Sequence, residues 1–364
     1  MHSLKKDHLN GKTSNLIKKE RTIMNRRQFL YGTTAVAMPV LVGCDNNDDE
    51  PIVIIDESYP VGPFGATSTA EEVTLGLDLS GKTAIVTGCN SGLGLETMRV
   101  LALRGAHVIG TGRNLEKARK ACSSVSGKTT PVALELSNLD SIAECADTVT
   151  KLGYPIDILV CNAGINTFGE LELVNGVERI FAVNHLGHFI LVNRLMPMLK
   201  KAKDSRIVHV SSRSAYMQAP EVGIDFDNLR GEGVFDYWEA YGRSKLANAL
   251  FSLELAVRLE GSNITSNALH PGLVQTNIAR NAPIMLRKAF DWFGEYIAKT
   301  PEQGAATQVY VATNPSLNEV SGAFFEDCNA VNVIGDNFLF DKPMAEQLWS
   351  TSEQMAQGYL IEWE

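Results

Sequence analysis

The sequence of 364 residues is 45% hydrophobic and 21% charged, which is the composition of a globular protein with ample length for one large domain. Its net charge is −9, and the body of the chain has no basic run, which argues against nucleic acid as a partner. Apart from Cys44, the cysteines are odd in number and lie in apolar or helical surroundings. They predict small core residues rather than a disulfide framework or a metal site. These cysteines are Cys89, Cys122, Cys145, Cys161 and Cys328.

The first 44 residues differ in character from the rest of the chain. Basic residues dominate 1–43, and the run Asn-Arg-Arg-Gln-Phe-Leu at 25–30 precedes an apolar stretch at 35–43. The basic run resembles a bacterial twin-arginine leader, and Leu-Val-Gly-Cys ending at Cys44 resembles a lipobox, whose cysteine is lipidated. We therefore expect an export signal over 1–44 and a membrane-anchored lipoprotein on the periplasmic or cell-surface side.

Two alternatives to this leader stay open. A plain signal peptide, or a basic arm with a chance apolar patch, has a similar composition, and a protein whose leader is not used stays cytoplasmic. Met24 is an alternative start, which would make residues 1–23 an upstream artefact. Residues 45–76 begin with a cluster of acidic side chains and show no core-forming pattern, so we expect an acidic tether there.

From residue 77 onward, short apolar runs alternate with amphipathic stretches. Strands are predicted at 83–87, 107–111, 131–136, 156–161, 206–210 and 265–269, with 323–325 as a candidate for the last one. Helices are predicted at 93–104, 115–124, 139–152, 176–201, 238–260 and 301–313. Strands that are apolar on both faces and separated by helices indicate a parallel sheet covered on each side. The predicted fold class is α/β, a doubly wound parallel sheet of the Rossmann type, in one domain over 77–364.

The turn after the first strand is rich in glycine and leads directly into a helix. Such a turn brings the backbone close to a pyrophosphate, and the helix N-terminus offers free N–H groups and a positive dipole end. The glycines depart from the spacing GxGxxG, and a tight turn without a ligand is the alternative. The candidate cofactor-binding residues are Gly88, Asn90, Ser91, Gly92, Leu93 and Gly94.

The end of the second strand bears on which dinucleotide is bound. A site for NAD usually places an acid here for the ribose 2′-OH, whereas a site for NADP tends to place a base for the 2′-phosphate. No acid stands at this strand end, and Arg113 follows at once. We therefore expect NADP as the cofactor, with NAD as the alternative, and a surface arginine at a helix start as the reading without a ligand.

Tyr241 and Lys245 are four residues apart in a predicted helix and so share one face. A positive charge beside a phenol favours the phenolate and lowers the pKa of the tyrosine from about 10 toward neutrality. The pair therefore predicts proton transfer near neutral pH. Alone it is weak, because this spacing also occurs on solvated helices.

The order of motifs along the chain carries more information than any of them alone. The glycine-rich turn, Asn162-Ala163-Gly164, Asn184, Ser212, the Tyr241 pair and Pro271-Gly272 together resemble the short-chain dehydrogenase/reductase family over about residues 77–333. The runs Asn-His-Leu-Gly-His-Phe at 184–189, Ala-Tyr-Gly-Arg-Ser-Lys-Leu-Ala-Asn at 240–248 and Leu-His-Pro-Gly at 269–272 are similar to its retinol dehydrogenase, WW-domain oxidoreductase and protochlorophyllide reductase branch.

This resemblance implies a catalytic set of Asn184, Ser212, Tyr241 and Lys245. Tyr241 would move a proton on the substrate oxygen while a hydride passes between nicotinamide and carbon. Lys245 would lower the pKa of Tyr241 and bond the nicotinamide ribose. Ser212 would hold the substrate oxygen, with Ser211 as its rival, and Asn184 would position a water that links Lys245 to solvent.

The resemblance also implies cofactor contacts beyond the first turn. Asn162, Ala163 and Gly164 would line the adenosine side, and Glu135 stands where the family has an acid near the adenine. Pro271 and Gly272 would run along the nicotinamide. Thr276 would reach the pyrophosphate or the carboxamide.

Several other stretches bear on the substrate and on partners. The aromatic segment 277–299 predicts a lid, and the 28 residues between Ser212 and Tyr241 predict a wall of the same cleft, for a bulky, rather apolar substrate. His185 and His188 lack a third metal ligand and are expected to pack in the core. Family resemblance also implies a homo-oligomer through helices 176–201 and 238–260.

Together these features predict an NADP(H)-dependent oxidoreductase that acts on a carbonyl/alcohol pair. One alternative is a catalytically silent, nucleotide-binding surface protein that kept the fold. The other is an epimerase or dehydratase that regenerates its cofactor with no net redox.

Overall fold

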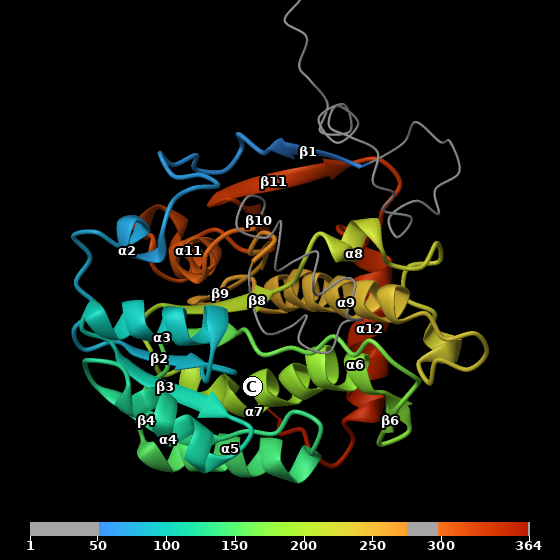
Figure 1. The fold of residues 1–364 in the computed structure, drawn as a ribbon, viewed down its shortest axis with the longest axis horizontal. Coiled ribbons are helices and arrows are strands. Elements are labelled where there is room, and N and C mark those ends of the chain that lie inside the picture. The colour runs from blue at the N-terminus through green and yellow to red at the C-terminus, as the bar shows by residue number, and fades with distance from the viewer. Residues whose placement is uncertain (1–50, 275–297, 363–364) are drawn as a thin grey trace, which may run out of the picture. The chain divides into compact units, whose positions relative to one another are not determined.

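The computed structural model describes residues 51–274 and 298–362, which build a nine-stranded sheet with helices on both faces (Figure 1). The strand order is β1-β11-β10-β9-β8-β5-β2-β3-β4. Neighbouring strands from β4 to β10 are parallel, whereas β11 and β1 are antiparallel additions at one edge. The predicted doubly wound parallel sheet is confirmed, and the two antiparallel strands extend it.

The strands of the large sheet are β1 (Ile52–Ile55), β2 (Thr83–Val86), β3 (His107–Gly112), β4 (Thr129–Ala133), β5 (Ile158–Cys161), β8 (Ser205–Val210), β9 (Ile264–His270), β10 (Phe324–Glu326) and β11 (Asn329–Ile334). A separate hairpin pairs β6 (Leu173–Val174) with β7 (Val177–Glu178).

The longer helices are α3 (Gly92–Leu103), α4 (Leu115–Ser123), α5 (Leu139–Leu152), α7 (Gly187–Leu199), α9 (Tyr237–Arg258), α11 (Pro301–Thr313) and α12 (Lys342–Met355). Shorter elements are α2 (Ala70–Val73), α6 (Arg179–Phe181), a π-helical turn (Ala182–Leu186), α8 (Ser214–Met217) and 3-10 turns at Phe226–Asn228 and Pro315–Leu317.

Two cores lie on opposite faces of the sheet because side chains alternate along each strand. Val86 belongs to the core that α3 and α11 cover, whereas Ile85 belongs to the core that α5 and α7 cover. The five cysteines of the described chain are buried thiols, as their surroundings predict. Strands that are buried on both faces therefore have the continuous apolar pattern that identifies a parallel sheet.

The segment just before the first predicted strand is folded, which corrects the predicted tether over 45–76. Strand β1 pairs with β11, with Ile52 opposite Ile334, and α2 begins at Thr69 with a capping box to Glu72. Val73 is buried in the core. The prediction fails from residue 52 onward because it overlooked the β-branched run Ile-Val-Ile-Ile of β1, whose partner strand lies near the other end of the chain. The predicted leader 1–44 lies outside the described residues.

Helix α12 covers α7 and α9. The ring of Trp349 packs against Phe189 at 5.0 Å and Phe251 at 5.8 Å between ring centroids. Its neighbour Ser352 forms a 2.7 Å hydrogen bond to Nε2 of His185. The covered face of α7 and α9 is not free for a second copy while α12 stays in place, and the homo-oligomer stays a prediction. In the described ranges, no helix is long and apolar enough to cross a bilayer.

Candidate active site

The candidate site lies where β2 and β5 end side by side. The chain runs from β2 to β3 on one side and later returns to β5 on the other, which makes this a topological switch point, where such sheets bind ligands. Thr87, just past β2, accepts hydrogen bonds at Oγ1 from the backbone N–H groups of Asn162 and Ala163, both at 2.9 Å. The Asn162 side chain returns a bond from Nδ2 to the Thr87 carbonyl at 2.8 Å. The two predicted motifs are therefore joined.

The glycines of the first turn permit an approach that side chains would block. A Cβ atom on Gly94 would lie 2.5 Å from the carbonyl oxygen of Gly88 and from Nδ2 of Asn162. One on Gly88 would lie 2.9 Å from Cβ of Ala163, and its φ of 68° already favours glycine. The closeness of these backbones fits a loop that brings its N–H groups up to a pyrophosphate.

The start of α3 keeps its N–H groups free of side-chain caps. Ser91 holds the N-cap position, and its side chain makes no capping hydrogen bond. By contrast, Asn114 caps α4 and Asn138 caps α5 through their side chains. The first N–H groups of α3 and its dipole can therefore act on an anion, so the residues present fit the phosphates of a dinucleotide.

Strand β3 ends with the sequence features that predict an NADP site. Arg113 directly follows β3 and is exposed, and no acid stands at the strand end. Oε1 of the Glu135 carboxylate accepts hydrogen bonds from the backbone N–H and hydroxyl of Ser137, at 3.2 and 2.8 Å, and its contact with an adenine stays a prediction. Glu135 therefore serves the turn between β4 and α5.

Ser211 and Ser212 have different surroundings at the end of β8. The hydroxyl of Ser211 is buried and donates to the carbonyl oxygen of Lys245 at 2.6 Å, so it is committed to α9. Ser212 is partly exposed, and its hydroxyl has hydrogen bonds of 3.2 Å with the backbone N–H and hydroxyl of Ser214 and acts on Tyr241 to lower the pKa of the phenol. The geometry favours Ser212 over its rival as the serine that meets a substrate.

Tyr241 and Lys245 share one face of α9, as their spacing predicts. Nζ of Lys245 is 5.6 Å from the centre of the Tyr241 ring and donates to the carbonyl oxygen of Val210 at 2.9 Å. Burial lowers the pKa of Lys245 to about 8. Burial also raises the pKa of Tyr241 above its ordinary value, with the Ser212 hydrogen bond acting the other way. The expected lowering of the Tyr241 pKa is therefore wrong for this structure, because the effect of burial outweighs that of the Ser212 hydrogen bond.

Asn184 lies in the π-helical turn before α7 and is completely buried. Its Oδ1 accepts from the N–H of Ile165 at 2.8 Å, and its Nδ2 donates to the Ile165 carbonyl at 2.9 Å and to Oγ of Ser244 at 3.0 Å. Gly164 leaves room here, because a Cβ on it would lie 3.3 Å from Oδ1 of Asn184 and 3.4 Å from Nζ of Lys245. The amide therefore ties the segment after β5 to α9, and the predicted water stays a prediction.

The loop after β9 closes the site from another side. Gly272 has a φ of 96°, and a Cβ on it would lie 2.6 Å from Cδ of Lys299. The backbone N–H of Lys299 donates to the Leu273 carbonyl at 2.7 Å, and its Nζ pairs with Asp327 at 2.6 Å. The contact of Pro271 and Gly272 with the nicotinamide stays a prediction, and Thr276 and most of the predicted lid 277–299 lie outside the described residues.

An aromatic cluster borders the start of α9. Phe168, from the segment after β5, packs edge-on against Tyr237 at 5.4 Å and Trp238 at 5.6 Å. The segment between Ser212 and Tyr241 is held to α9 by Arg243, which donates to the carbonyl oxygen of Asn228 at 3.1 Å. Phe168 is absent from the sequence-based prediction, and its position four residues after Gly164 is the signal that could have identified it.

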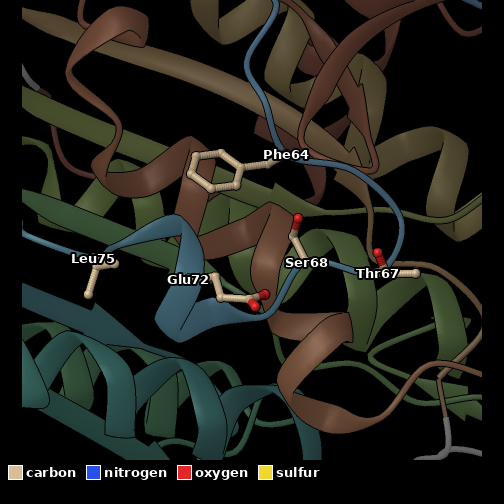
Figure 2. A pocket seen from close by; sticks show the side chains of 5 residues that line it. All are labelled: Phe64, Thr67, Ser68, Glu72 and Leu75. Atoms are coloured by element: carbon tan, nitrogen blue, oxygen red, sulfur yellow. The ribbon is translucent and has the colours of Figure 1, made fainter.

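A surface hollow elsewhere does not belong to this site. Figure 2 shows its lining, which comes from the segment that precedes β2 and includes Phe64, Ser68 and Glu72. None of the predicted site residues lines it. Glu72 is already engaged in the capping box of α2. The convergence of side chains at the carboxyl ends of β2, β5 and β8 therefore identifies the site, and the hollow does not.

Comparison with known proteins agrees with this geometry. The sequence model of the short chain dehydrogenase family matches residues 82–224. Short-chain dehydrogenase TIC 32 A, chloroplastic, of Brassica napus is 38% identical, across 81% of this chain and 95% of its own. Retinol dehydrogenase 14 of Homo sapiens is 37% identical across 76% of this chain and 87% of its own, and the human WW domain-containing oxidoreductase is 36% identical across 82% and 73%.

Solved structures share the fold. An uncharacterised protein from Mycobacterium Paratuberculosis matches with a TM-score of 0.62 at 32% identity, over 78% of this chain and 97% of that one. A 3-ketoacyl-(acyl-carrier-protein) reductase from Brucella melitensis, complexed with NADH, matches with a TM-score of 0.54 at 25% identity, over 68% and 97%. Because identity above 30% extends over more than two thirds of the chain, the protein belongs to the short chain dehydrogenase family, in its retinol dehydrogenase-like branch, and is an NAD(P)-dependent oxidoreductase.

Proposed function

We propose that the protein transfers a hydride between NADP(H) and the carbonyl or alcohol carbon of a bulky, rather apolar substrate, with Tyr241 as the proton-transfer residue. The observation that carries this proposal is the convergence of Tyr241, Ser212 and Lys245 beside the glycine-rich turn at the carboxyl ends of the strands. When bound, the cofactor would supply or accept the hydride at its nicotinamide ring.

Ser212, Tyr241 and Lys245 each have a separate role in the proposed reaction. Ser212 holds the substrate oxygen and stabilises the charge that develops on it. Tyr241 donates its hydroxyl proton to that oxygen in the reducing direction and takes it back in the oxidising direction. The phenol of Tyr241 is protonated at neutral pH and so carries the proton that a carbonyl oxygen would receive, although burial raises its pKa and weakens it as an acid. Lys245, fixed by Val210, supplies positive charge beneath the phenol.

The preference for NADP rests on Arg113. Its exposed guanidinium at the end of β3 can form paired, charge-assisted hydrogen bonds with a 2′-phosphate, and no carboxylate there competes for the ribose. The NADP bound in a solved NAD(P) dependent gluconate 5-dehydrogenase, 25% identical with a TM-score of 0.54, supports the same cofactor.

The substrate class rests on the aromatic lining. Phe168, Tyr237 and Trp238 place three rings beside the start of the catalytic helix, and such a wall favours an apolar molecule. The name of retinol dehydrogenase 14 supports a bulky apolar alcohol, since retinol is one.

The decisive experiment compares the wild type with Tyr241→Phe in a panel of carbonyls and alcohols with NADPH and NADH. We expect turnover to fall by about 10³-fold, because a positioned acid or base contributes roughly 10²–10⁴-fold. Cofactor affinity should stay within about twofold, because the phenol oxygen is the group removed. No turnover by the wild type with any compound would favour a silent protein. Turnover without stoichiometric cofactor consumption would favour an epimerase or dehydratase.

We further propose that the chain is exported and anchored through a lipid on Cys44, on the support of the two leader motifs in the expected order. An exported enzyme that released its cofactor in each cycle would stall, so retention of the cofactor and its recycling by a second substrate would be required. Cys44 should incorporate a labelled lipid precursor, and Cys44→Ser should not. A cytoplasmic product with an intact N-terminus would contradict the proposal.

A further inference from the structure

His188 lies between two parts of the site that are far apart in sequence. It sits in the first turn of α7 and is 1% exposed. Its Nδ1 is 3.0 Å from the carbonyl oxygen of Asn184, and its Nε2 is 3.0 Å from Oγ1 of Thr87. One imidazole therefore contacts both the π-helical turn and the end of β2.

The direction of each hydrogen bond follows from its partner. A carbonyl oxygen can only accept, so Nδ1 carries the hydrogen. Burial lowers the pKa of His188 to about 4, so the ring is neutral at pH 7 and Nε2 accepts the hydroxyl hydrogen of Thr87. The competing acceptor for that hydroxyl, the carbonyl oxygen of Val160, is farther away at 3.4 Å. The ring is thus held in one tautomer by two different partners.

Each partner continues into the site. Oγ1 of Thr87 accepts the N–H groups of Asn162 and Ala163, and a Cβ on Gly88 would collide with that same Ala163. Asn184 holds Ser244, the residue before Lys245, through its side-chain amide. We call these two hydrogen bonds the arms of His188. The arm at Nε2 connects the ring through Thr87 to the glycine-rich turn, and the arm at Nδ1 connects it through Asn184 to α9.

We propose that His188 is a positioning residue that sets cofactor affinity through its bond with Thr87 and turnover through its bond with Asn184. The proposal rests on the proposed function and adds a residue that touches neither cofactor nor substrate. Each arm is a single buried hydrogen bond whose loss leaves a polar group without its partner, which corresponds to about a tenfold effect on the parameter it controls.

His185 provides a matched control. It lies three residues earlier, is 0% exposed, and also has a pKa that burial lowers. Its Nε2 contacts Ser352 of α12, and its ring packs on Phe181 and Phe251, so its described contacts lead away from the site. Substitution of His185 therefore measures the cost of removing a buried imidazole from this region.

The experiment separates the two arms with two substitutions. In His188→Asn the amide nitrogen takes the place of Nδ1 and keeps the bond to Asn184, whereas in His188→Gln the amide oxygen takes the place of Nε2 and keeps the bond from Thr87. We expect His188→Asn to weaken NADPH binding about tenfold, with kcat within about threefold of the wild type. We expect His188→Gln to lower kcat about tenfold, with NADPH affinity within about threefold. His185→Asn and His185→Gln should leave both parameters unchanged.

Opposite effects on the two parameters support the proposal, because a general loss of packing would lower both together. Equal effects from both His188 variants, or effects that the His185 variants reproduce, would overturn it. So would His188 variants that fail to fold where their His185 counterparts fold, since that result would assign His188 a purely structural role. NADPH affinity is measured without substrate, so the Thr87 arm is tested even when the wild type turns over nothing and the proposed function fails.

Discussion

Two charged side chains at opposite ends of the sheet, Asp157 and Lys245, have contrasting partners. At the amino ends of the strands, Asp157 accepts hydrogen bonds from the backbone N–H of Thr83 at 2.9 Å and from Nζ of Lys82 at 2.7 Å. At the carboxyl ends, the buried ammonium of Lys245 has a carbonyl oxygen as its partner, and no carboxylate of the described chain forms an ion pair with it. The start of α3 at the same end lacks a side-chain cap.

This difference indicates which end is built for stability and which for chemistry. Where a carboxylate and a buried N–H group form a hydrogen bond with each other, the folded state is stabilised and neither group is left to bind a ligand. A buried cation without a counter-charge costs stability, and its lowered pKa measures that cost. The surroundings of Lys245 and the start of α3 are thus electrostatically incomplete, although Arg213 pairs with Glu326 and Lys299 with Asp327 at the same end of the sheet. Asp157 provides the reference at the opposite end.

The largest expected effect comes from Lys245→Met, which removes the uncompensated charge. Turnover should fall by at least about 10²-fold, because the phenol loses the cation beneath it. The free energy of unfolding at pH 7 should rise by up to about 3 kcal/mol, since the pKa of Lys245 falls from 10.5 to about 8 on folding. Assays of turnover and denaturant unfolding would test both statements.

The lowered pKa of Lys245 also determines how the free energy of unfolding changes with pH. Between pH 8 and 10.5 the unfolded chain binds more protons at Lys245 than the folded chain does, so the wild type gains stability as the pH rises through this window. The advantage of Lys245→Met should be greatest below pH 8 and shrink toward pH 10.5. An advantage that grows with pH would show that burial of the charge is not its source.

Arg113→Ala tests the carboxyl end where it meets the cofactor. NADPH affinity should fall about tenfold to hundredfold, because a charge-assisted hydrogen bond is worth roughly 1.5–3 kcal/mol, and NADH affinity should hardly change. Titration of both cofactors measures the ratio. Lys120→Ala is the matched control, since it removes an exposed positive charge near the far end of α4. Equal losses for NADPH and NADH would refute a contact with the 2′-phosphate.

Asp157→Ala should affect stability alone. It leaves the buried N–H of Thr83 without an acceptor, which costs about 1–3 kcal/mol, while turnover per folded molecule stays that of the wild type. Asp147→Ala serves as the control, because its ion pair with Arg194 is largely exposed on the aspartate side and should be worth less than about 1 kcal/mol. A loss of turnover in folded Asp157→Ala would mean that the two ends are not independent.

Local sequence patterns predicted the repeated strand–helix units. They did not predict contacts between segments that are distant in sequence. Helices 139–152 and 301–313 begin and end where the sequence predicts, because their caps Asn138 and Thr300 are local signals. Strand β1 had a local signal in its four β-branched residues, whereas its partner was not predictable from them, since β11 lies near the other end of the chain. Helix α12 was not among the predicted helices, although the N-cap Asp341 and the following Pro343 are local signals for a helix start and its pattern resembles that of the other helices.

For the candidate site, residue spacing placed Tyr241 and Lys245 on one helix face, whereas the bonds of Asn162 and Ala163 to Thr87 were seen only in the structure. The direction of the Tyr241 pKa shift could not be predicted from the sequence, because desolvation depends on all the groups that pack around the ring. The π-helical geometry at Asn184 and the bridging role of His188 depend in the same way on contacts between elements that are distant in sequence.

The pairing of β1 with β11 also sets the timing of folding during synthesis. Ile52 leaves the ribosome early, and its partner Ile334 leaves it near the end, so β1 has no strand to join until most of the chain has been made. Until then, an isoleucine-rich edge waits unpaired in a nascent chain, where it can associate with other chains. A late step of assembly therefore protects the first described strand, and conditions that slow synthesis of the C-terminal strands should favour aggregation.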